Sequence, residues 1–182
     1  MAGVTVNLRR GGVGAIAITA AILLWRLRPG SVAHAEGPIR EPQAVARLAT
    51  WAPAPPASRA GRVMGYVWAG PLTVAGLLIG VLSRTRPQVR DGVLLFSDAR
   101  GVGGRMLRWR GFAAATLGHT IITAREPSTR LLRHELVHVR QAERWGPLFV
   151  PLYLAGLLRY GYRRNPFERA AYDAAADGPT PA

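Results

Sequence analysis

Two histidines and a glutamate stand in the pattern H-E-x-x-H within the segment from Arg133 to Gln141. Residues four apart lie on one face of an α-helix, so the imidazoles of His134 and His138 could both reach one cation. Zinc accepts neutral imidazole nitrogen at about 2.0–2.1 Å, a distance that only a same-face pair can satisfy together. Chance gives about 0.003 copies of this pattern in a chain of this composition. The spacing therefore predicts a metal site.

Glu135 follows the first of these histidines, so its carboxylate would reach the open side of the metal, where water binds. Zinc lowers the pKa of such a water to about 7, and a neighbouring carboxylate can take its proton for attack on a carbonyl. This order of residues predicts hydrolysis by zinc-activated water, with Glu135 as the base. The alternative is a solvated helix face on which the histidines pair with Glu135.

A catalytic zinc site needs a third protein ligand. Glu168, within Asn165-Pro166-Phe167-Glu168-Arg169, is the candidate, and Asp173 is the alternative ligand. The same segment is also typical of a helix start, with Asn165 as N-cap, Pro166 at the first position and Glu168 at the third. In that role Glu168 would only bind backbone donors, and the sequence leaves both roles open.

The combination of H-E-L-x-H-V-x-Q with a downstream N-P-F-E-R-x-A resembles gluzincin-type metallopeptidases, especially small membrane-linked bacterial members without assigned activity. The resemblance covers about residues 91–173. It implies that His134, His138 and Glu168 bind zinc, that Glu135 is the base, and that the substrate is a peptide or protein. It also implies an edge strand just before the active-site helix, over residues 116–124, flanking the substrate.

The chain departs from this pattern at Ala170 and Tyr172, which stand where acidic residues are expected. We therefore expect fewer groups that orient the metal ligands. Candidates for contacting the substrate or stabilising an oxyanion are His119, Tyr160, Tyr162 and Tyr172. A lone histidine in a strand or a tyrosine at an interface can equally be structural.

The elements that must position these residues follow from hydrophobic patterns. A helix over 129–145 is indicated by Pro127-Ser128 before it and Gly146-Pro147 after it. Strands are indicated over 93–96, over 106–109 after a turn at 98–104, and over 116–124, which contains the β-branched run 120–123. Residues 146–158 indicate an apolar helix that is too short for a membrane span. We predict an α+β, zincin-like domain over 91–176, with a small antiparallel sheet and an active-site helix followed by further helices.

The stretch from Tyr66 to Ser83 contains no charged residue and is flanked by Tyr66 and Trp68 at one end and by Arg84, Arg86 and Arg90 at the other. These features predict a transmembrane helix within residues 64–86. The alternative is a buried core helix. The arginines that follow the span would place the C-terminal domain on the cytoplasmic side of the membrane.

Residues 1–63 are predicted to be an extension that is largely disordered, and 177–182 a flexible tail. The apolar run 11–25 resembles a signal-peptide core, although arginines separate it from the cleavage-like Ala33-His34-Ala35. An over-extended reading frame before Met64 is a further alternative.

The composition limits the remaining choices. The net charge is +14, and every basic residue is arginine. The arginines are scattered, which indicates no specific nucleic-acid partner. The absence of cysteine excludes disulfides and thiolate metal sites. Two rivals to a membrane-tethered metallopeptidase stay open: a non-catalytic membrane protein of the same fold, and a basic protein that binds nucleic acid or anionic lipid. The sequence indicates neither a specific substrate nor an oligomeric state.

Overall fold

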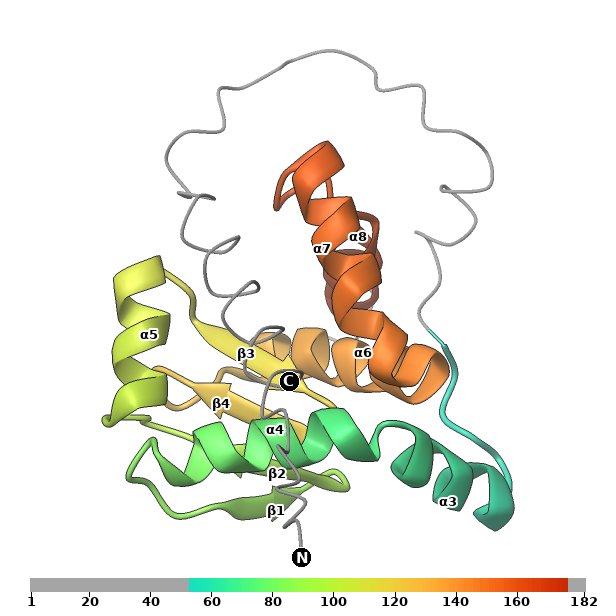
Figure 1. Ribbon diagram of the computed structural model, residues 1–182, viewed down its shortest axis with the longest axis horizontal. Helices are drawn as coiled ribbons and strands as arrows, with labels where there is room; N and C mark the ends of the chain where they lie inside the picture. The colour runs from blue at the N-terminus through green and yellow to red at the C-terminus, as the bar shows by residue number, and fades with distance from the viewer. Residues whose placement is uncertain (1–52, 177–182) are drawn as a thin grey trace, which may run out of the picture. The chain divides into compact units, whose positions relative to one another are not determined.

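The computed structural model describes residues 53–176 (Figure 1). The predictions for residues 1–52, including the signal-like run 11–25, and for the tail 177–182 lie outside the described residues. The elements follow in the order α3 (Arg59–Trp68), α4 (Gly70–Val81), β1 (Gln88–Arg90), β2 (Val93–Phe96), α5 (Val102–Arg110), β3 (Ala114–Leu117), β4 (Thr120–Thr123), α6 (Thr129–Trp145), the 3-10 turn η1 (Gly146–Leu148), α7 (Phe149–Tyr160) and α8 (Pro166–Ala176). This is the α+β class that the sequence indicated.

The four strands form one mixed sheet in the order β1-β2-β4-β3. The expected antiparallel sheet is therefore wrong in one respect, because β2 and β4 are parallel. The two other pairs, β1 with β2 and β3 with β4, are antiparallel. The parallel pair results from the connection between β2 and β4. After β2 the chain passes through α5 to the edge strand β3, and the hairpin that follows places β4 between β3 and β2.

Residues 106–109 lie in α5, so the strand expected there is wrong. The buried positions of this segment are Gly103, Gly104, Leu107 and Arg110, a spacing of three to four residues rather than two. Gly104 allows the close contact of α5 with the preceding loop, because an added Cβ would lie 1.7 Å from the carbonyl oxygen of Ala99. Tertiary packing therefore decides the conformation of this short segment.

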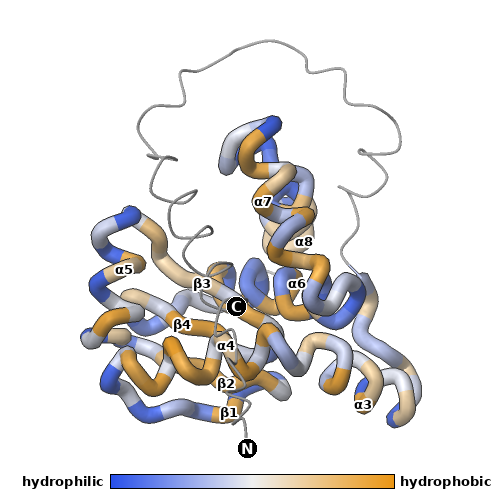
Figure 2. Tube along the Cα trace, in the orientation of Figure 1, coloured by the Kyte–Doolittle hydropathy of each residue, from blue (hydrophilic) through white to orange (hydrophobic). Residues whose placement is uncertain are grey.

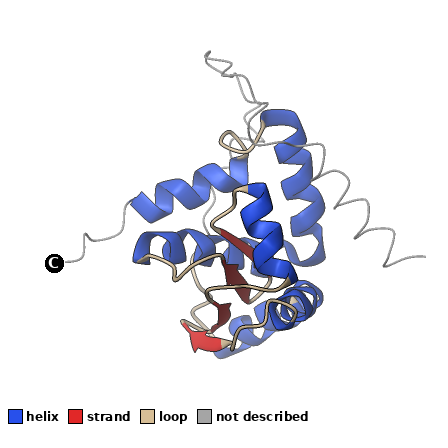
Figure 3. Ribbon diagram, turned by 90° about the vertical axis from the view of Figure 1, so that its left-hand side faces the viewer, coloured by secondary structure: helices blue, strands red, loops and turns tan. Residues whose placement is uncertain are grey.

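The sheet is covered by helices on both faces (Figures 1 and 3). Leu95 and Ile121 are paired across β2 and β4 and pack on one face against Leu132 and Val139 of α6. Their neighbours Phe96 and Ile122 point to the other face, where the cluster includes Leu107 of α5 and Ile79 of α4. Because successive side chains of a strand point to opposite faces, β2 and β4 contribute to an apolar layer on each face of the sheet.

The uncharged stretch 66–83 forms two helices rather than one. Helices α3 and α4 meet at Ala69 with a bend of 62°, and Pro71 in the first turn of α4 lacks the N–H that a continuous helix would need. Among the described residues, no single helix is long and apolar enough to cross a membrane, although the bent pair has the required length and composition. Helix α3 begins at Arg59, before the predicted boundary at Met64.

Helices α3 and α4 belong to the folded domain that contains the sheet. Ala69, at their junction, shares an apolar cluster with Ala142 of α6 and Phe149 of α7. Gly76 and Gly80 let α4 approach the sheet, since an added Cβ at Gly80 would lie 2.5 Å from the buried ring of Phe96. The domain therefore begins well before Asp91.

This contact gives a direct test of the packing of α4. We expect Gly80→Ala to destabilise the protein by about 1–3 kcal/mol, because the methyl group overpacks against Phe96. Gly70→Ala is the matched control in the same helix, since nothing lies within 4 Å of its added Cβ. Chemical denaturation of both variants measures the difference, and equal stabilities would contradict the close approach.

Candidate metal centre

Helix α6 spans Thr129–Trp145, as predicted. It begins where the Ser128 hydroxyl accepts a hydrogen bond from the backbone N–H of Leu131 at 3.2 Å. It ends at Gly146, which has a positive φ of 52°. Since Leu132 and Val139 fix one side of α6 on the sheet, the side chains of His134 and His138 are directed to a different side, towards α8.

Helix α8 carries the third member of the cluster. The Asn165 side chain accepts a hydrogen bond from the N–H of Phe167 at 3.2 Å and donates one to the Tyr153 carbonyl at 3.1 Å. The backbone N–H of Asn165 donates to the carbonyl of Tyr162, so a capping box with Glu168 does not form. Glu168 is 2% exposed and faces the two histidines, so the capping-box role is wrong and the carboxylate is placed where a ligand would lie.

His134, His138 and Glu168 form a buried group whose ligand atoms all lie within 4.8 Å of one another. The Nε2 atoms of the two histidines are 3.2 Å apart. The Glu168 carboxylate lies 3.2 Å from His134 Nε2 and 3.4 Å from His138 Nε2. The group could bind a metal ion. Asp173, the alternative ligand, is exposed and not part of it.

Two features of these side chains fit a cation at this point. Oε2 of Glu168 is buried and has no hydrogen-bond donor, which is unfavourable for a carboxylate oxygen unless a positive charge faces it. Gln141 donates to the Phe167 carbonyl, so its Oε1 must accept from Nδ1 of His138 at 2.8 Å. Nδ1 of His138 is thus engaged by Gln141, and Nε2 is the atom of His138 that faces the cluster and would bind a cation in place of a proton.

The charges of the group shift its pKa values. Burial alone would lower the pKa of His138, but the hydrogen bond to Glu168 and the charge of Glu135 outweigh it and raise the pKa to about 8. Burial alone would raise the pKa of Glu168, but the adjacent imidazoles of His134 and His138 and the Tyr153 hydroxyl outweigh this and lower the pKa. At neutral pH Glu168 is therefore an anionic oxygen donor.

Two side chains that orient the ligands were missed in the sequence. The Tyr153 hydroxyl donates to Oε1 of Glu168 at 2.6 Å, and Gln141 holds His138. Tyr153 has the only hydroxyl of the apolar segment 146–158, and Gln141 lies three residues after His138 on the same helix face. Those two facts were the available signals. Tyr153 and Gln141 orient Glu168 and His138, a role that the sequence analysis expected to be weakened because Ala170 and Tyr172 replace acidic residues.

Glu135 is held by the sheet. The Thr116 hydroxyl of β3 donates to Oε2 of Glu135 at 2.6 Å. β3 is an edge strand, whereas β4, which directly precedes α6, lies between β2 and β3. The expectation of an edge strand over 116–124 is therefore wrong for 120–123, because those residues pair on both sides and are buried. The strand edge that borders Glu135 belongs to β3.

The tyrosine candidates divide into two groups. The ring of Tyr172 lies 4.5 Å from that of His134. Tyr162 is hydrogen-bonded to Tyr172, and burial, the charge of Glu168 and this hydrogen bond raise its pKa. Tyr160 lies against the guanidinium of Arg159 in its own helix. Tyr162 and Tyr172 are thus brought to the group formed by His134, His138 and Glu168, whereas Tyr160 is not.

His119 belongs to a second polar cluster on a different side of α6. Its Nε2 lies 2.9 Å from Oε1 of Glu143, which Arg140 also contacts at 2.9 Å. Its backbone N–H donates to the Thr73 hydroxyl, and its ring stacks on Tyr66 at 3.9 Å. These contacts tie α3, α4, the β3–β4 turn and α6 together.

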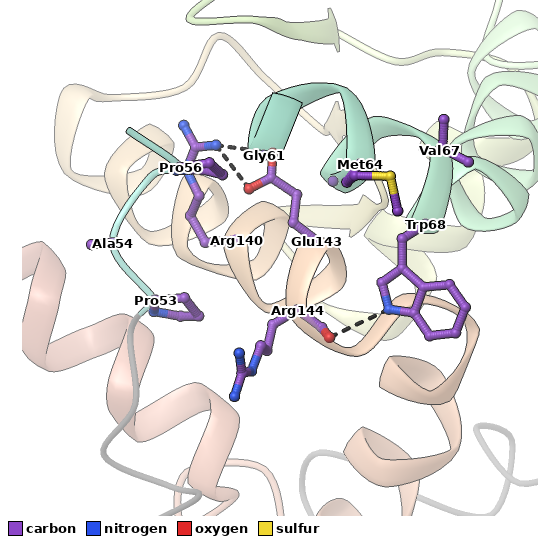
Figure 4. A pocket seen from close by; sticks show the side chains of 11 residues that line it. Pro53, Ala54, Pro56, Gly61, Met64, Val67, Trp68, Arg140, Glu143 and Arg144 are labelled. Atoms are coloured by element: carbon purple, nitrogen blue, oxygen red, sulfur yellow. Dashed lines mark hydrogen bonds and ion pairs between the residues drawn. The ribbon is translucent and has the colours of Figure 1, made fainter. Parts of the chain in front are cut away.

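A pocket of about 440 Å³ lies between α3 and α6, on the side of this second cluster (Figure 4). Its lining is mostly apolar, with Met64, Val67 and Trp68 on one side and Arg140 and Arg144 on the other. His134, His138 and Glu168 are not among the lining residues. This pocket is therefore separate from the candidate metal site.

Comparison of the chain with protein-family models, with curated proteins and with solved structures returned no match. The geometry of the cluster is therefore the basis for any functional assignment.

The role of Glu168 can be tested with a substitution that keeps its shape. Glu168→Gln removes the anionic oxygen, so we expect zinc affinity to fall by at least tenfold, as the loss of a ligand charge requires. Asp173→Asn is the matched control on the same helix and should bind as the wild type does, because Asp173 is exposed. Competition with a fluorescent chelator measures both, and similar affinities would contradict the assignment.

The second cluster predicts a pH dependence of stability. Burial alone would raise the pKa of Glu143, but hydrogen bonds with His119 and Arg140 outweigh it and lower the pKa below its ordinary value of 4.5. A carboxylate with a lowered pKa stabilises the fold above its unfolded pKa and loses this effect as the pH falls through the folded pKa.

Glu143→Gln should therefore lower the melting temperature at pH 7, and the difference from the wild type should shrink below about pH 4.5. Glu126→Gln, at an exposed position, is the control. Melting curves recorded from pH 7 to pH 3 provide the test, and a constant difference would show that the charge of Glu143 plays no part.

Proposed function

We propose that His134, His138 and Glu168 hold a zinc ion and that the protein hydrolyses peptide bonds. The observation that carries this proposal is the approach of Glu168 from a separate helix to two histidines at H-E-x-x-H spacing, with one buried carboxylate oxygen lacking a donor. Two imidazoles and one carboxylate are a ligand set of catalytic zinc sites, which leave a further position for water or substrate. The resemblance to gluzincin-type peptidases supports the same choice of metal.

Zinc at this site would polarise a carbonyl group and lower the pKa of a water molecule. Glu135 would act as the general base. The Thr116 hydroxyl occupies Oε2 of Glu135, so Oε1 is the oxygen left to accept a proton and later deliver it to the leaving nitrogen. The hydrogen bond also fixes the carboxylate, and a fixed base needs no reorganisation during the reaction.

The surroundings of Glu135 support a peptide as substrate. An edge strand presents backbone N–H and C=O groups to a further strand, and an extended peptide can pair with them. Thr116 lies on the edge strand β3 and contacts Glu135. The ring of Tyr172 lies 4.5 Å from that of His134, and Tyr162 is hydrogen-bonded to Tyr172, so the two hydroxyls are candidates for binding an oxyanion.

The test separates metal binding from hydrolysis. Glu135→Gln should keep about one zinc per chain but lose peptide hydrolysis by at least a hundredfold, because an amide cannot accept the proton. Zinc content by atomic emission and cleavage of a quenched fluorescent peptide library are measured on the same preparation. Glu126→Gln, an exposed glutamate, should leave both unchanged.

His134→Ala and His138→Ala should each lose the metal, since two remaining ligands cannot hold catalytic zinc. Zinc retained in both variants, or hydrolysis retained in Glu135→Gln, would contradict the proposed function.

A further inference from the structure

The outer side of α4 is apolar and exposed. We call Val74, Leu77, Leu78, Val81 and Leu82, which recur every three to four residues, the apolar face. Leu78 and Val81 are each 63% exposed, and the hydropathy colouring marks α4 as largely hydrophobic (Figure 2). Water is a poor solvent for such a row of side chains, and an exposed apolar surface of this kind marks an interaction site.

The inner side of α4 is fixed to the rest of the domain. Gly76 and Gly80 are buried against the sheet, and an added Cβ at Gly76 would lie 2.8 Å from the carbonyl oxygen of Leu117. The carbonyl of Ser83, just beyond the helix, accepts hydrogen bonds from the N–H groups of Arg100 and Gly101 at 2.9 Å. To be surrounded by lipid, α4 would have to leave the sheet and uncover Phe96. Only the outer side is free to meet a membrane.

The charges around this face match an anionic bilayer. No charged residue occurs from Val63 to Ser83, whereas Arg59 and Arg62 precede this stretch and Arg84 and Arg86 follow it. Interfacial helices insert their apolar side below the headgroups while arginines reach the anionic phosphates. A second copy of the chain is a poorer partner, because each copy carries a net charge of +14 and like charges repel.

We propose that the apolar face of α4 inserts into one leaflet of an anionic bilayer, with the helix lying in the plane of the membrane. The proposal is independent of the metal centre. It replaces the spanning helix that the sequence indicated with a one-sided contact that leaves the fold intact.

The test measures the depth of individual positions in the full-length chain. The chain contains no cysteine, so single spin labels can be placed at Val74→Cys and Val81→Cys on the apolar face. Val89→Cys, at an 80% exposed position of the edge strand β1, is the control. Electron paramagnetic resonance with oxygen and a nickel chelate as relaxation agents gives the depth of each label in phosphatidylcholine–phosphatidylglycerol vesicles. Because depth is specific to each position, binding through the apolar run 11–25 does not affect the result.

Both labels on the apolar face should lie at the same depth, about 5–10 Å below the headgroups, and the label at Val89 should stay in water. Seven residues of helix span about 10 Å, so two labels that differ in depth by that amount would indicate a crossing helix and overturn the proposal. Labels that all stay in water would overturn it, as would spin–spin coupling between copies without vesicles, which indicates self-association.

A second arm tests the charge. Replacing Arg62 and Arg86 by Gln should weaken binding of the full chain to anionic vesicles roughly fivefold for each arginine removed, with little effect on neutral vesicles. The control replaces Arg125 and Arg130, which are exposed and away from α4 in the sequence. An equal loss in both double variants would show that only the overall charge matters and would overturn the assignment of this face.

Discussion

A buried carboxylate that faces two imidazoles is the interaction on which the rest of this structure depends. An isolated charge of this kind is costly to remove from water, by several kcal/mol even after the surroundings relax. The Tyr153 hydroxyl donates to Oε1 of Glu168, whereas Oε2 lies 3.2 Å from His134 Nε2 without forming a hydrogen bond. A cation would satisfy that oxygen and the lone pairs of both imidazoles at once. A metal ion bound at this group would therefore couple its own binding to the packing of α8 on α6.

The connection between α6 and α8 can be understood from this requirement. Helix α7 must bring Tyr153 to Glu168, and the carbonyl of the same tyrosine accepts from the side chain of Asn165. Asn165 in turn sets the first turn of α8 and hence the direction of Glu168. Gly156 makes room for this arrangement, because an added Cβ would lie 2.7 Å from Oδ1 of Asn165. One tyrosine thus holds both the ligand and the helix that carries it.

The sequence predicted those parts whose determinants are local. The limits of α6, the strand at 93–96 and the spacing of the two histidines follow from caps, periodicity and residue type within about ten residues, whereas the predicted strand 116–124 contains β4 but also the turn that precedes it. The order of the strands, the helix at 102–110 and the bend at Ala69 depend on contacts between distant segments. Tyr153 was missed for the same reason: the single hydroxyl in an apolar run marks it as unusual, but does not show that it meets a carboxylate fifteen residues later.

Helix α6 carries both the candidate metal ligands and Glu143 of the second polar cluster, and one hairpin contacts it beside each. The turn Gly118-His119 joins β3 to β4, and Gly118 adopts a positive φ of 57°, which a two-residue turn of this kind requires. His119 fixes this turn to Thr73 of α4 and to Glu143 of α6. Two residues before the turn, Thr116 holds Glu135. Because Glu135 and Glu143 of α6 both contact the same hairpin, the position of the proposed base relative to α4 is set by hydrogen bonds rather than by apolar packing alone. Apolar contacts tolerate small shifts, whereas hydrogen bonds depend strongly on direction. A carboxylate that acts as a base needs a fixed orientation, which these hydrogen bonds provide.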